Sequence, residues 1–341
     1  MKKWYEKSGP QADVVISTRV RLARNLPDIP FPARMTQQQR RQMEETVRQA
    51  VQHSQAVLEK PLHFEPMDTL SQLAAISLVE RHLASPEFIT QRPGRALFLS
   101  EDESVSVMVG EEDHVRIQVM QEGMELTQAY RRASALDDAL NTSLHFAFDS
   151  RLGYLTQCPT NLGTGLRASL MLHLPALQEG GVLGRIAGDL SKLGLTLRGT
   201  YGEGSQAVGA LYQLSNQVSL GLKEEEALAN LQSIAMQIME QERAARAELA
   251  QRLEQQDRIF RSLGILRSAC VLSSEEFMKR ISAVRMGVST GLIPDISYDT
   301  IHTLIVQTQP ATMMQNGRIP PAQRDALRAK LVKEALGCAA K

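Results

Sequence analysis

Cysteine is scarce in this sequence, and its scarcity argues against two classes of small fold. The 341 residues contain three cysteines, Cys158, Cys270 and Cys338, and no C-x-x-C pair. An odd and widely spaced set is not typical of a secreted disulfide framework or of a structural zinc site, so we predict no metal held by protein ligands alone. A chain of this length can bury a large core without cross-links and suggests two domains, or one with an appendage.

Long apolar runs, net charge and aromatic residues are also lacking. No stretch approaches the apolar length of a membrane span, and the N-terminal segment MKKWYEKSGP lacks the apolar region of a signal peptide. The 38 lysines and arginines balance 38 acidic residues, and aromatic residues make up only 4 %. Nucleic-acid binding usually needs positive charge and stacking rings. We therefore predict a cytoplasmic protein with no membrane partner and no direct nucleic-acid partner.

Hydrophobic periodicity predicts a mixed front part and a helical tail. The front part has strand patterns over 14–21, 105–109, 115–120 and 196–198, a hairpin over 145–156, and helix patterns over 36–59, 68–84 and 165–178. One long helix is predicted from 223 to 261, followed by helices beginning near Ser273 and Pro320, the last with Leu327 and Leu331 facing inward. Clustered strands favour an α+β fold over a parallel sheet.

Four polar segments interrupt the apolar pattern of the front part. They read STRVR at 17–21, EEDHVR at 111–116, CPTNLGTGLR at 158–167 and RGTYGE at 198–203. Arginine binds phosphate oxygens in pairs, and several arginines together can hold a triphosphate and neutralise the group in transfer. A surface salt bridge is the simpler interpretation of any one of these arginines. The chain has no P-loop and no protein-kinase motif.

In order and spacing, the four segments resemble the motifs of the phosphagen (guanidino) kinase family, and the chain from about residue 11 onward is similar to the protein-arginine kinases within it. The resemblance implies a catalytic domain over 11–240, with an antiparallel sheet flanked by helices. It also implies a small all-helical domain over 241–341 that would form a homodimer and bind phosphoarginine. Only 16 residues precede Ser17, whereas kinases of small guanidino metabolites carry a helical domain there. The acceptor side is therefore expected to be open to an arginine on another protein.

The resemblance implies an ATP site, with Mg²⁺ held mainly through the nucleotide phosphates. Five arginines would surround these phosphates: Arg19, Arg21, Arg116, Arg167 and Arg198. The wider set of implied contacts is Ser17, Thr18, Val20, Ala168, Ser169, Leu170, Met171, Gly199, Thr200, Tyr201, Gly202 and Glu203. His82 is assigned to the adenine side, although a histidine on a helix surface is an equally good interpretation.

The acceptor guanidinium has a pKa above about 12 and must lose a proton as it attacks. By resemblance, Glu112 is the catalytic base and Glu203 is a second carboxylate on a loop, while Glu111 and Asp113 are structural neighbours. Cys158 is expected to orient the substrate without forming a covalent bond. Hydroxyl groups of Thr160 and Thr164 and a nearby helix N-terminus are expected to favour its thiolate. The cysteines at 270 and 338 are predicted to be structural.

A further motif, RDALRA, lies near the C-terminus. Arg324 and Arg328 are four residues apart on a predicted helix, so they share a face. The interpretation without a function is a series of solvent-exposed ion pairs along the helix, a solvated ladder. The resemblance instead implies a phosphoarginine pocket made by Arg324, Asp325, Arg328 and Ala329.

Three functions remain open at this point. The resemblance favours an ATP-dependent protein-arginine kinase whose product marks proteins for a Clp-type protease in the stress response, with an activator protein and a stress-gene repressor as partners. The first alternative is a kinase of a small guanidino metabolite such as free arginine. The second is a non-catalytic adaptor that binds phosphoarginine-tagged proteins.

Overall fold

The structure is a computed structural model that describes residues 1–55, 58–200, 207–315 and 317–337. Within these ranges the main sheet has the strand order β2-β3-β4-β5-β1-β8-β10-β9, and all neighbouring strands are antiparallel. The α+β prediction and the antiparallel sheet are confirmed. The strands are β1 (Val15–Arg24), β2 (Leu62–Pro66), β3 (Ala96–Ser100), β4 (Val105–Val109), β5 (Val115–Glu122), β8 (Leu166–His173), β9 (Leu195–Gly199) and β10 (Leu211–Asn216).

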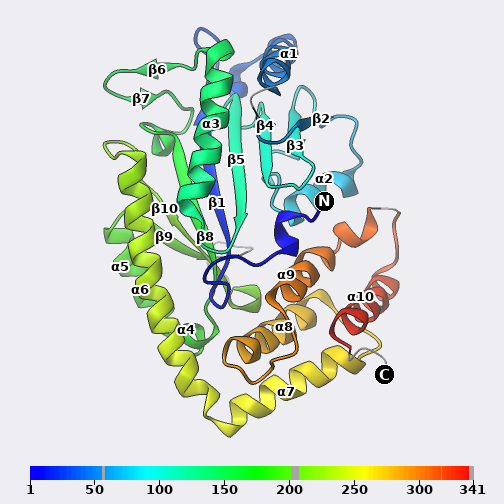
Figure 1. Cartoon of the computed structure of the whole chain (residues 1–341). Helices are drawn as coiled ribbons and strands as arrows, with labels where there is room; N and C mark the ends of the chain where they lie inside the picture. The colour runs from blue at the N-terminus through cyan, green and yellow to red at the C-terminus, as the bar shows by residue number, and fades with distance from the viewer. Residues whose placement is uncertain (56–57, 201–206, 316, 338–341) are drawn as a thin grey trace.

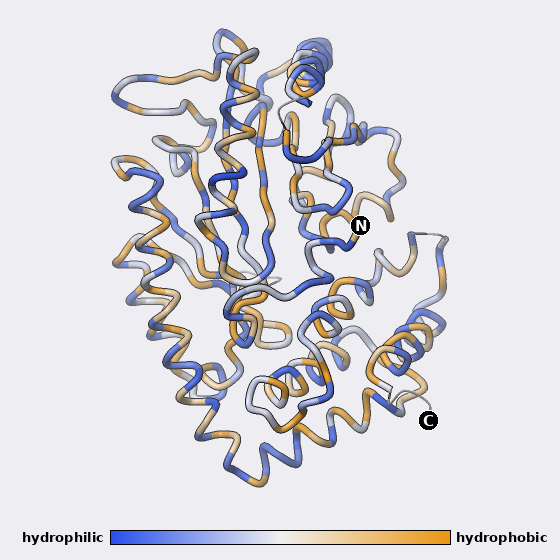
Figure 2. The backbone as a smooth tube through the Cα atoms, viewed as in Figure 1, coloured by the Kyte–Doolittle hydropathy of each residue, from blue (hydrophilic) through white to orange (hydrophobic). Residues whose placement is uncertain are grey.

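Helices cover one face of this sheet and enclose its hydrophobic core (Figure 1). Helix α3 (Leu126–Leu144) packs on β1 and β5, α1 (Gln37–Ser54) packs on α3, and α6 (Glu224–Ala250) packs on β8 and β10. Val20 and Leu22 of β1 are buried in this core, and Figure 2 shows apolar residues gathered along the central strands. Because side chains alternate along a strand, the adjacent Arg19 and Arg21 point to the other face.

The predicted helix over 165–178 is wrong. Residues 166–173 form strand β8 between β1 and β10, and only Pro175–Glu179 form a short helix, α4. Leu166 and Leu170 are spaced as on one face of a helix, yet they are also an even number of residues apart, as on one face of a strand. Pairing with two strands that are distant in the sequence decides between these patterns.

Most other local predictions are confirmed within a few residues. The strand patterns over 105–109 and 115–120 are β4 and β5, and the helix patterns at 36–59 and 68–84 are α1 and α2 (Gln72–Glu80). The hairpin over 145–156 reduces to the short pair β6 (Phe148–Asp149) and β7 (Gly153–Tyr154). Helix α5 (Leu183–Lys192) precedes β9.

The tail forms a second helical cluster with its own core. The predicted helix over 223–261 is interrupted after α6, and α7 (Leu253–Ser268) begins a new direction (Figure 1). The remaining helices are α8 (Ser274–Ser289), α9 (Tyr298–Gln307) and α10 (Pro321–Leu336). Leu327 is 37 % exposed, so its predicted inward orientation is wrong; Val332 and Leu336 of α10 enter the second core instead. No helix in the described part of the chain is long and apolar enough to cross a bilayer.

A buried network of charges joins the tail to the start of β1. Glu242 of α6 is fully buried, accepts two main-chain N–H groups at the start of α4, and pairs with Arg246 at 2.7 Å. Arg246 and Arg285 of α8 both donate to the main-chain carbonyl of Asp13, at 2.7 and 2.9 Å. Helices α6 and α8 therefore fix the segment that leads directly into the central strand.

Arg246→Met is expected to lower the free energy of unfolding by about 3–5 kcal/mol, because it leaves the Glu242 carboxylate buried without its cation. The matched control is Arg261→Met on α7. Arg261 also pairs with a carboxylate four residues away, Asp257, at 2.6 Å, but this pair is exposed. Urea denaturation should show a much smaller loss for the control. Equal losses for the two variants would contradict the role given to the buried pair.

Candidate functional site

Strand register gathers the predicted arginines on the face of the sheet opposite α3. Arg19 and Arg21 alternate along β1, and Arg21 lies directly opposite Arg167 of β8. The pairing of β1 with β5 places Arg116 on this face. The pairings of β8 with β10 and of β10 with β9 place Arg198 on this face as well. We call these five residues the arginine face.

The arginines of this face repel one another in a partly dry environment. Burial, together with the positive charges of Arg167 and Arg116, lowers the pKa of Arg19 to about 10. Burial, with Arg19 and other neighbouring arginines, also holds the pKa of Arg21 well below its usual range. In the described part of the chain, the buried Nε atoms of Arg21 and Arg167 have no hydrogen-bond partner. Such a group of cations is suited to a polyanion that supplies both charge and acceptors.

Arg19 and His82 line a small cavity at one end of the arginine face. Arg19 donates to Gln213 Oε1 at 2.6 Å and to Ser169 Oγ at 3.4 Å. His82 lies beyond the end of α2 with a φ of 62°, so its interpretation as a helix-surface histidine is wrong. Burial, followed by the charge of Arg19, lowers the pKa of His82 to about 4. Ser17 and Met171 also line this cavity. No local motif marks Gln213, which reaches the site through the register of β10.

The other residues predicted to contact the nucleotide fall into four groups. Val20, Ala168 and Leu170 place their side chains in the hydrophobic core on the opposite face of the sheet. Thr18 is also buried, and its Oγ1 donates to the carbonyl of Gly123. Thr200, after Gly199 at the end of β9, donates through Oγ1 to the carbonyl of Leu211. Tyr201, Gly202 and Glu203 lie outside the described residues.

The acidic turn between β4 and β5 places Glu112 against the arginine face. Glu112 Oε2 lies 3.2 Å from Arg116 Nη2, and its side chain is 37 % exposed. Burial raises the pKa of Glu112, and the nearby charges of Asp113 and Glu111 add to this, whereas Arg116 and Arg21 act in the opposite direction. A carboxylate with a raised pKa, open to solvent on one side, can accept a proton from an incoming group.

The two acidic neighbours of Glu112 face inward. Asp113 is fully buried, and its Oδ1 accepts hydrogen bonds from Asn25 Nδ2 and from the main-chain N–H of Gln157, at 2.7 and 2.8 Å. Glu111 is 6 % exposed and forms an ion pair with Arg116. Asp113 therefore fixes the residue before Cys158 relative to the acidic turn.

Cys158 lies in a loop that leads into a strand. It is followed by a single 3-10 turn at Pro159–Asn161 and then by β8, so the predicted helix N-terminus beside it is absent from these described residues. Its Sγ lies 3.0 Å from Thr160 Oγ1, as predicted for one of the two hydroxyl groups. Thr164 Oγ1 instead accepts the main-chain N–H of Leu166. Burial lowers the pKa of Arg167, whereas the nearby Cys158 and Glu112 act to raise it. Cys158 and Glu112 are therefore both close enough to Arg167 to interact with its charge.

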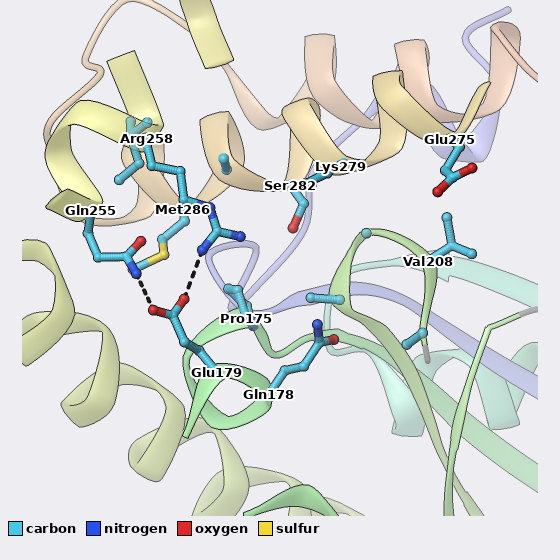
Figure 3. A pocket seen from close by; sticks show the side chains of 15 residues that line it. Pro175, Gln178, Glu179, Val208, Gln255, Arg258, Glu275, Lys279, Ser282 and Met286 are labelled. Atoms are coloured by element: carbon cyan, nitrogen blue, oxygen red, sulfur yellow. Dashed lines mark hydrogen bonds and ion pairs between the residues drawn. The ribbon is translucent and has the colours of Figure 1, made fainter. Parts of the chain in front are cut away.

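A separate cavity of about 480 Å³ lies between the sheet body and the tail (Figure 3). The residues Val208–Ala210 form one wall, and side chains of α4, α7 and α8 form the others. Glu179 of α4 accepts hydrogen bonds from Gln255 and Arg258 of α7, the latter at 3.0 Å. None of the described residues predicted for catalysis or nucleotide binding lines this cavity.

The RDALRA motif lies on α10, and its two arginines differ in environment. Arg328 is fully buried and donates to the main-chain carbonyls of Leu272 and Thr308, at 2.7 and 3.1 Å, and to Asp325 at 2.6 Å. Arg324 is partly exposed, and its Nε has no hydrogen-bond partner among the described residues. The interpretation as a solvated ladder is therefore wrong for Arg328.

Two family models match consecutive parts of the chain. Residues 42–245 match the C-terminal catalytic domain of ATP:guanido phosphotransferases. Residues 250–341 match the model described as the protein-arginine kinase McsB C-terminal domain.

Individual proteins are similar over nearly the whole chain. A protein-arginine kinase of Symbiobacterium thermophilum is 46 % identical over 339 residues, which cover 98 % of this chain and 96 % of that protein. One from Geobacillus stearothermophilus is 42 % identical over 337 residues, covering 98 % and 93 %. Among solved structures, lombricine kinase superposes with a TM-score of 0.60 at 25 % identity, covering 70 % of each chain. The duplicated taurocyamine kinase of Schistosoma mansoni with bound transition-state-analogue components gives 0.60 at 33 % identity, covering 67 % of this chain and 33 % of that one.

Proposed function

Because this chain belongs to the ATP:guanido phosphotransferase family, and within it to the protein-arginine kinases, we infer that it transfers the γ-phosphate of ATP to arginine side chains in proteins. The observation that carries this function is the arginine face. Arg21 and Arg167 present buried N–H groups without partners beside the carboxylate of Glu112. A polyphosphate would supply acceptors for these groups, and a guanidinium would approach the carboxylate.

The proposed reaction forms one N–P bond and breaks the bond between the β–γ bridging oxygen and the γ-phosphorus. A guanidino nitrogen of the acceptor attacks the γ-phosphorus, Glu112 takes the proton that this nitrogen loses, and ADP leaves with the bridging oxygen. The arginine face neutralises the charge that spreads over the transferring group, which is most of what phosphoryl transfer requires. Mg²⁺, held mainly through the nucleotide phosphates, would add to this neutralisation.

The remaining roles rest on the family resemblance together with position. Cys158 would orient the acceptor guanidinium, and its proximity to Arg167 and Glu112 supports this role. Glu203 would be the second carboxylate, and it lies outside the described residues. His82 would lie toward the nucleotide base, and its place beside Arg19 supports this role. The catalytic domain would span 11–240, and the helical C-terminal domain, which would dimerise and bind phosphoarginine, would span 241–341.

The cellular role is also a proposal from the resemblance. The phosphorylated proteins would be degraded by a Clp-type protease during stress, in the cytoplasm. An activator protein and a stress-gene repressor would be partners, and the helical domain would support a homodimer.

A labelling experiment tests the proposed function. The protein is incubated with Mg²⁺, γ-labelled ATP and an arginine-rich basic protein, and free arginine serves as a parallel acceptor. Acid-labile label on the protein acceptor is expected, because an N–P bond is cleaved in acid. Label on free arginine alone would favour the metabolite kinase, and no transfer to either acceptor would favour the adaptor.

Arg324→Ala is expected to abolish binding of free phosphoarginine to the tail while leaving the melting temperature nearly unchanged, because Arg324 is partly exposed. Arg328→Ala is a poorer test, since it removes a buried side chain and the donor to two carbonyls. Calorimetric titration with phosphoarginine checks the first variant. Wild-type affinity in Arg324→Ala would contradict the proposed pocket.

A further inference from the structure

A pocket of about 450 Å³ opens beside Glu112. Its walls come from the segment before α1, from α1 itself, from the loop after α2, from the acidic turn and from the residue before Cys158. Its charged and amide-bearing lining residues include Arg40, Glu87, Arg95, Glu111, Arg116 and Gln157. Because Glu112 also lines this pocket, a group bound in it lies beside the proposed base.

The three arginines of this pocket already form hydrogen bonds or ion pairs with groups of the same chain. Arg95 is buried and donates to the main-chain carbonyls of residues 87, 88 and 110, at 2.7–2.8 Å. Arg40 donates to the carbonyl of Pro32. Arg116 pairs with Glu111 and Glu112. The positive charges of the pocket are therefore turned toward the protein's own acceptors.

Two hydrogen-bond acceptors of the pocket, by contrast, have no partner among the described residues. The exposed carboxylate of Glu87 has no hydrogen bond or ion pair within the described ranges, although its main-chain carbonyl holds Arg95. Deeper in the pocket, Gln157 Oε1 is buried and has no donor among the described residues. A ligand that completes this pocket should therefore bring N–H donors to its interior and positive charge to its rim.

We propose that this pocket receives the segment of a protein substrate that carries the target arginine, and that Glu87 selects segments with a second lysine or arginine next to the target. The inference rests on the proposed function and names its substrate class. An arginine side chain offers five N–H donors, more than Glu112 alone can accept, and Gln157 Oε1, which lacks a donor, would accept another. The neighbouring cation of the substrate then pairs with Glu87 at the rim.

Peptides that differ only beside the target test this specificity. Each of four peptides contains one arginine. In the first three this arginine is flanked by two lysines, two alanines or two glutamates, and in the fourth it is flanked by two acetylated lysines. We expect the wild-type enzyme to favour the lysine peptide over the alanine peptide in kcat/KM by roughly 1.5- to 5-fold, the range of an exposed ion pair. The preference should decline toward 1 in 0.5 M salt because surface charges are screened.

Variants of Glu87 separate recognition from folding. Glu87→Gln should bring the preference for lysine over alanine close to 1, and Glu87→Lys should reverse it in favour of the glutamate peptide. Glu65 is an exposed carboxylate on β2 outside the pocket, so Glu65→Gln and Glu65→Lys, with the same changes in charge, should keep the wild-type preference. The KM for ATP in each variant reports whether the arginine face is intact.

The outcomes distinguish this inference from the proposed function. An undiminished preference for lysine in Glu87→Gln, or a Glu87→Lys enzyme that still prefers lysine, would overturn the role of Glu87 while the kinase function stands. Equal kcat/KM values of the wild-type enzyme for all four peptides would also overturn the role of Glu87 and leave the kinase function standing. No label on any peptide or protein acceptor would contradict the proposed function itself.

Discussion

Glu112→Gln should lower kcat by roughly 10²–10⁴-fold, the contribution of a general base. The amide keeps the size of the side chain but cannot take the proton that the guanidinium must lose. Glu112 is suited to this step because burial raises its pKa while one side remains open to the pocket. Steady-state kinetics with a protein acceptor measure the loss.

Two further readouts separate a catalytic role from a structural one. The KM for ATP should change little in Glu112→Gln, because the phosphates are assigned to the arginine face. The base acts in its ionised form, so wild-type kcat/KM should fall as the pH drops through the raised pKa of Glu112, which lies above its ordinary value of 4.5. Residual activity of Glu112→Gln should lack this acid limb. A variant that retains wild-type kcat and the same acid limb would exclude Glu112 as the base.

Arg21→Met should have opposite effects on activity and on stability. It removes a charged contact to the transferring group, and arginines in this role contribute on the order of 10³-fold or more to phosphoryl transfer. The free protein should nevertheless become more stable. Because the pKa of Arg21 in the fold lies well below its ordinary value, its charged form is less favourable in the folded chain than in the unfolded one. Replacing such a buried charge with an apolar side chain of similar length should raise the free energy of unfolding by about 1–2 kcal/mol.

Thermal unfolding with and without Mg²⁺·ADP measures both effects. The nucleotide should stabilise the wild-type protein and should stabilise Arg21→Met much less, because the variant binds it more weakly. The control is Arg41→Met on α1, an exposed position, where the same substitution should leave kcat, nucleotide stabilisation and melting temperature almost unchanged. If Arg21→Met is less stable than the wild type and still binds nucleotide, the arginine face does not have the role given to it.

The sequence was most informative where a strand alternates strictly. Arg19 and Arg21 are separated by one apolar residue, so their shared face followed from local spacing alone. It was least informative at 166–173, where the apolar positions fit a helix as well as a strand. There the choice depends on pairing with β1 and β10, and such long-range pairing outweighs local preference. The helix N-terminus expected beside Cys158 was wrong for the same reason, since the segment that follows this loop is β8.

Other features could not be inferred because their partners are main-chain atoms from distant segments. Arg328 is buried because the carbonyls of Leu272 and Thr308 come together around it. Glu87 and Arg95 lie in a loop without a recognisable motif, and they reach the pocket only because the acidic turn folds against that loop. Residue spacing contains no signal for contacts of this kind.

Mapping the transferred phosphoryl group tests the central claim most directly. A basic protein acceptor is incubated with Mg²⁺·ATP and either the wild-type enzyme or Glu112→Gln, and phosphorylated side chains are located by mass spectrometry under non-acidic conditions. We predict phosphate on arginine residues of the acceptor with the wild-type enzyme and almost none with the variant. Phosphate on serine, threonine or tyrosine, or equal arginine phosphorylation by the two enzymes, would contradict this account.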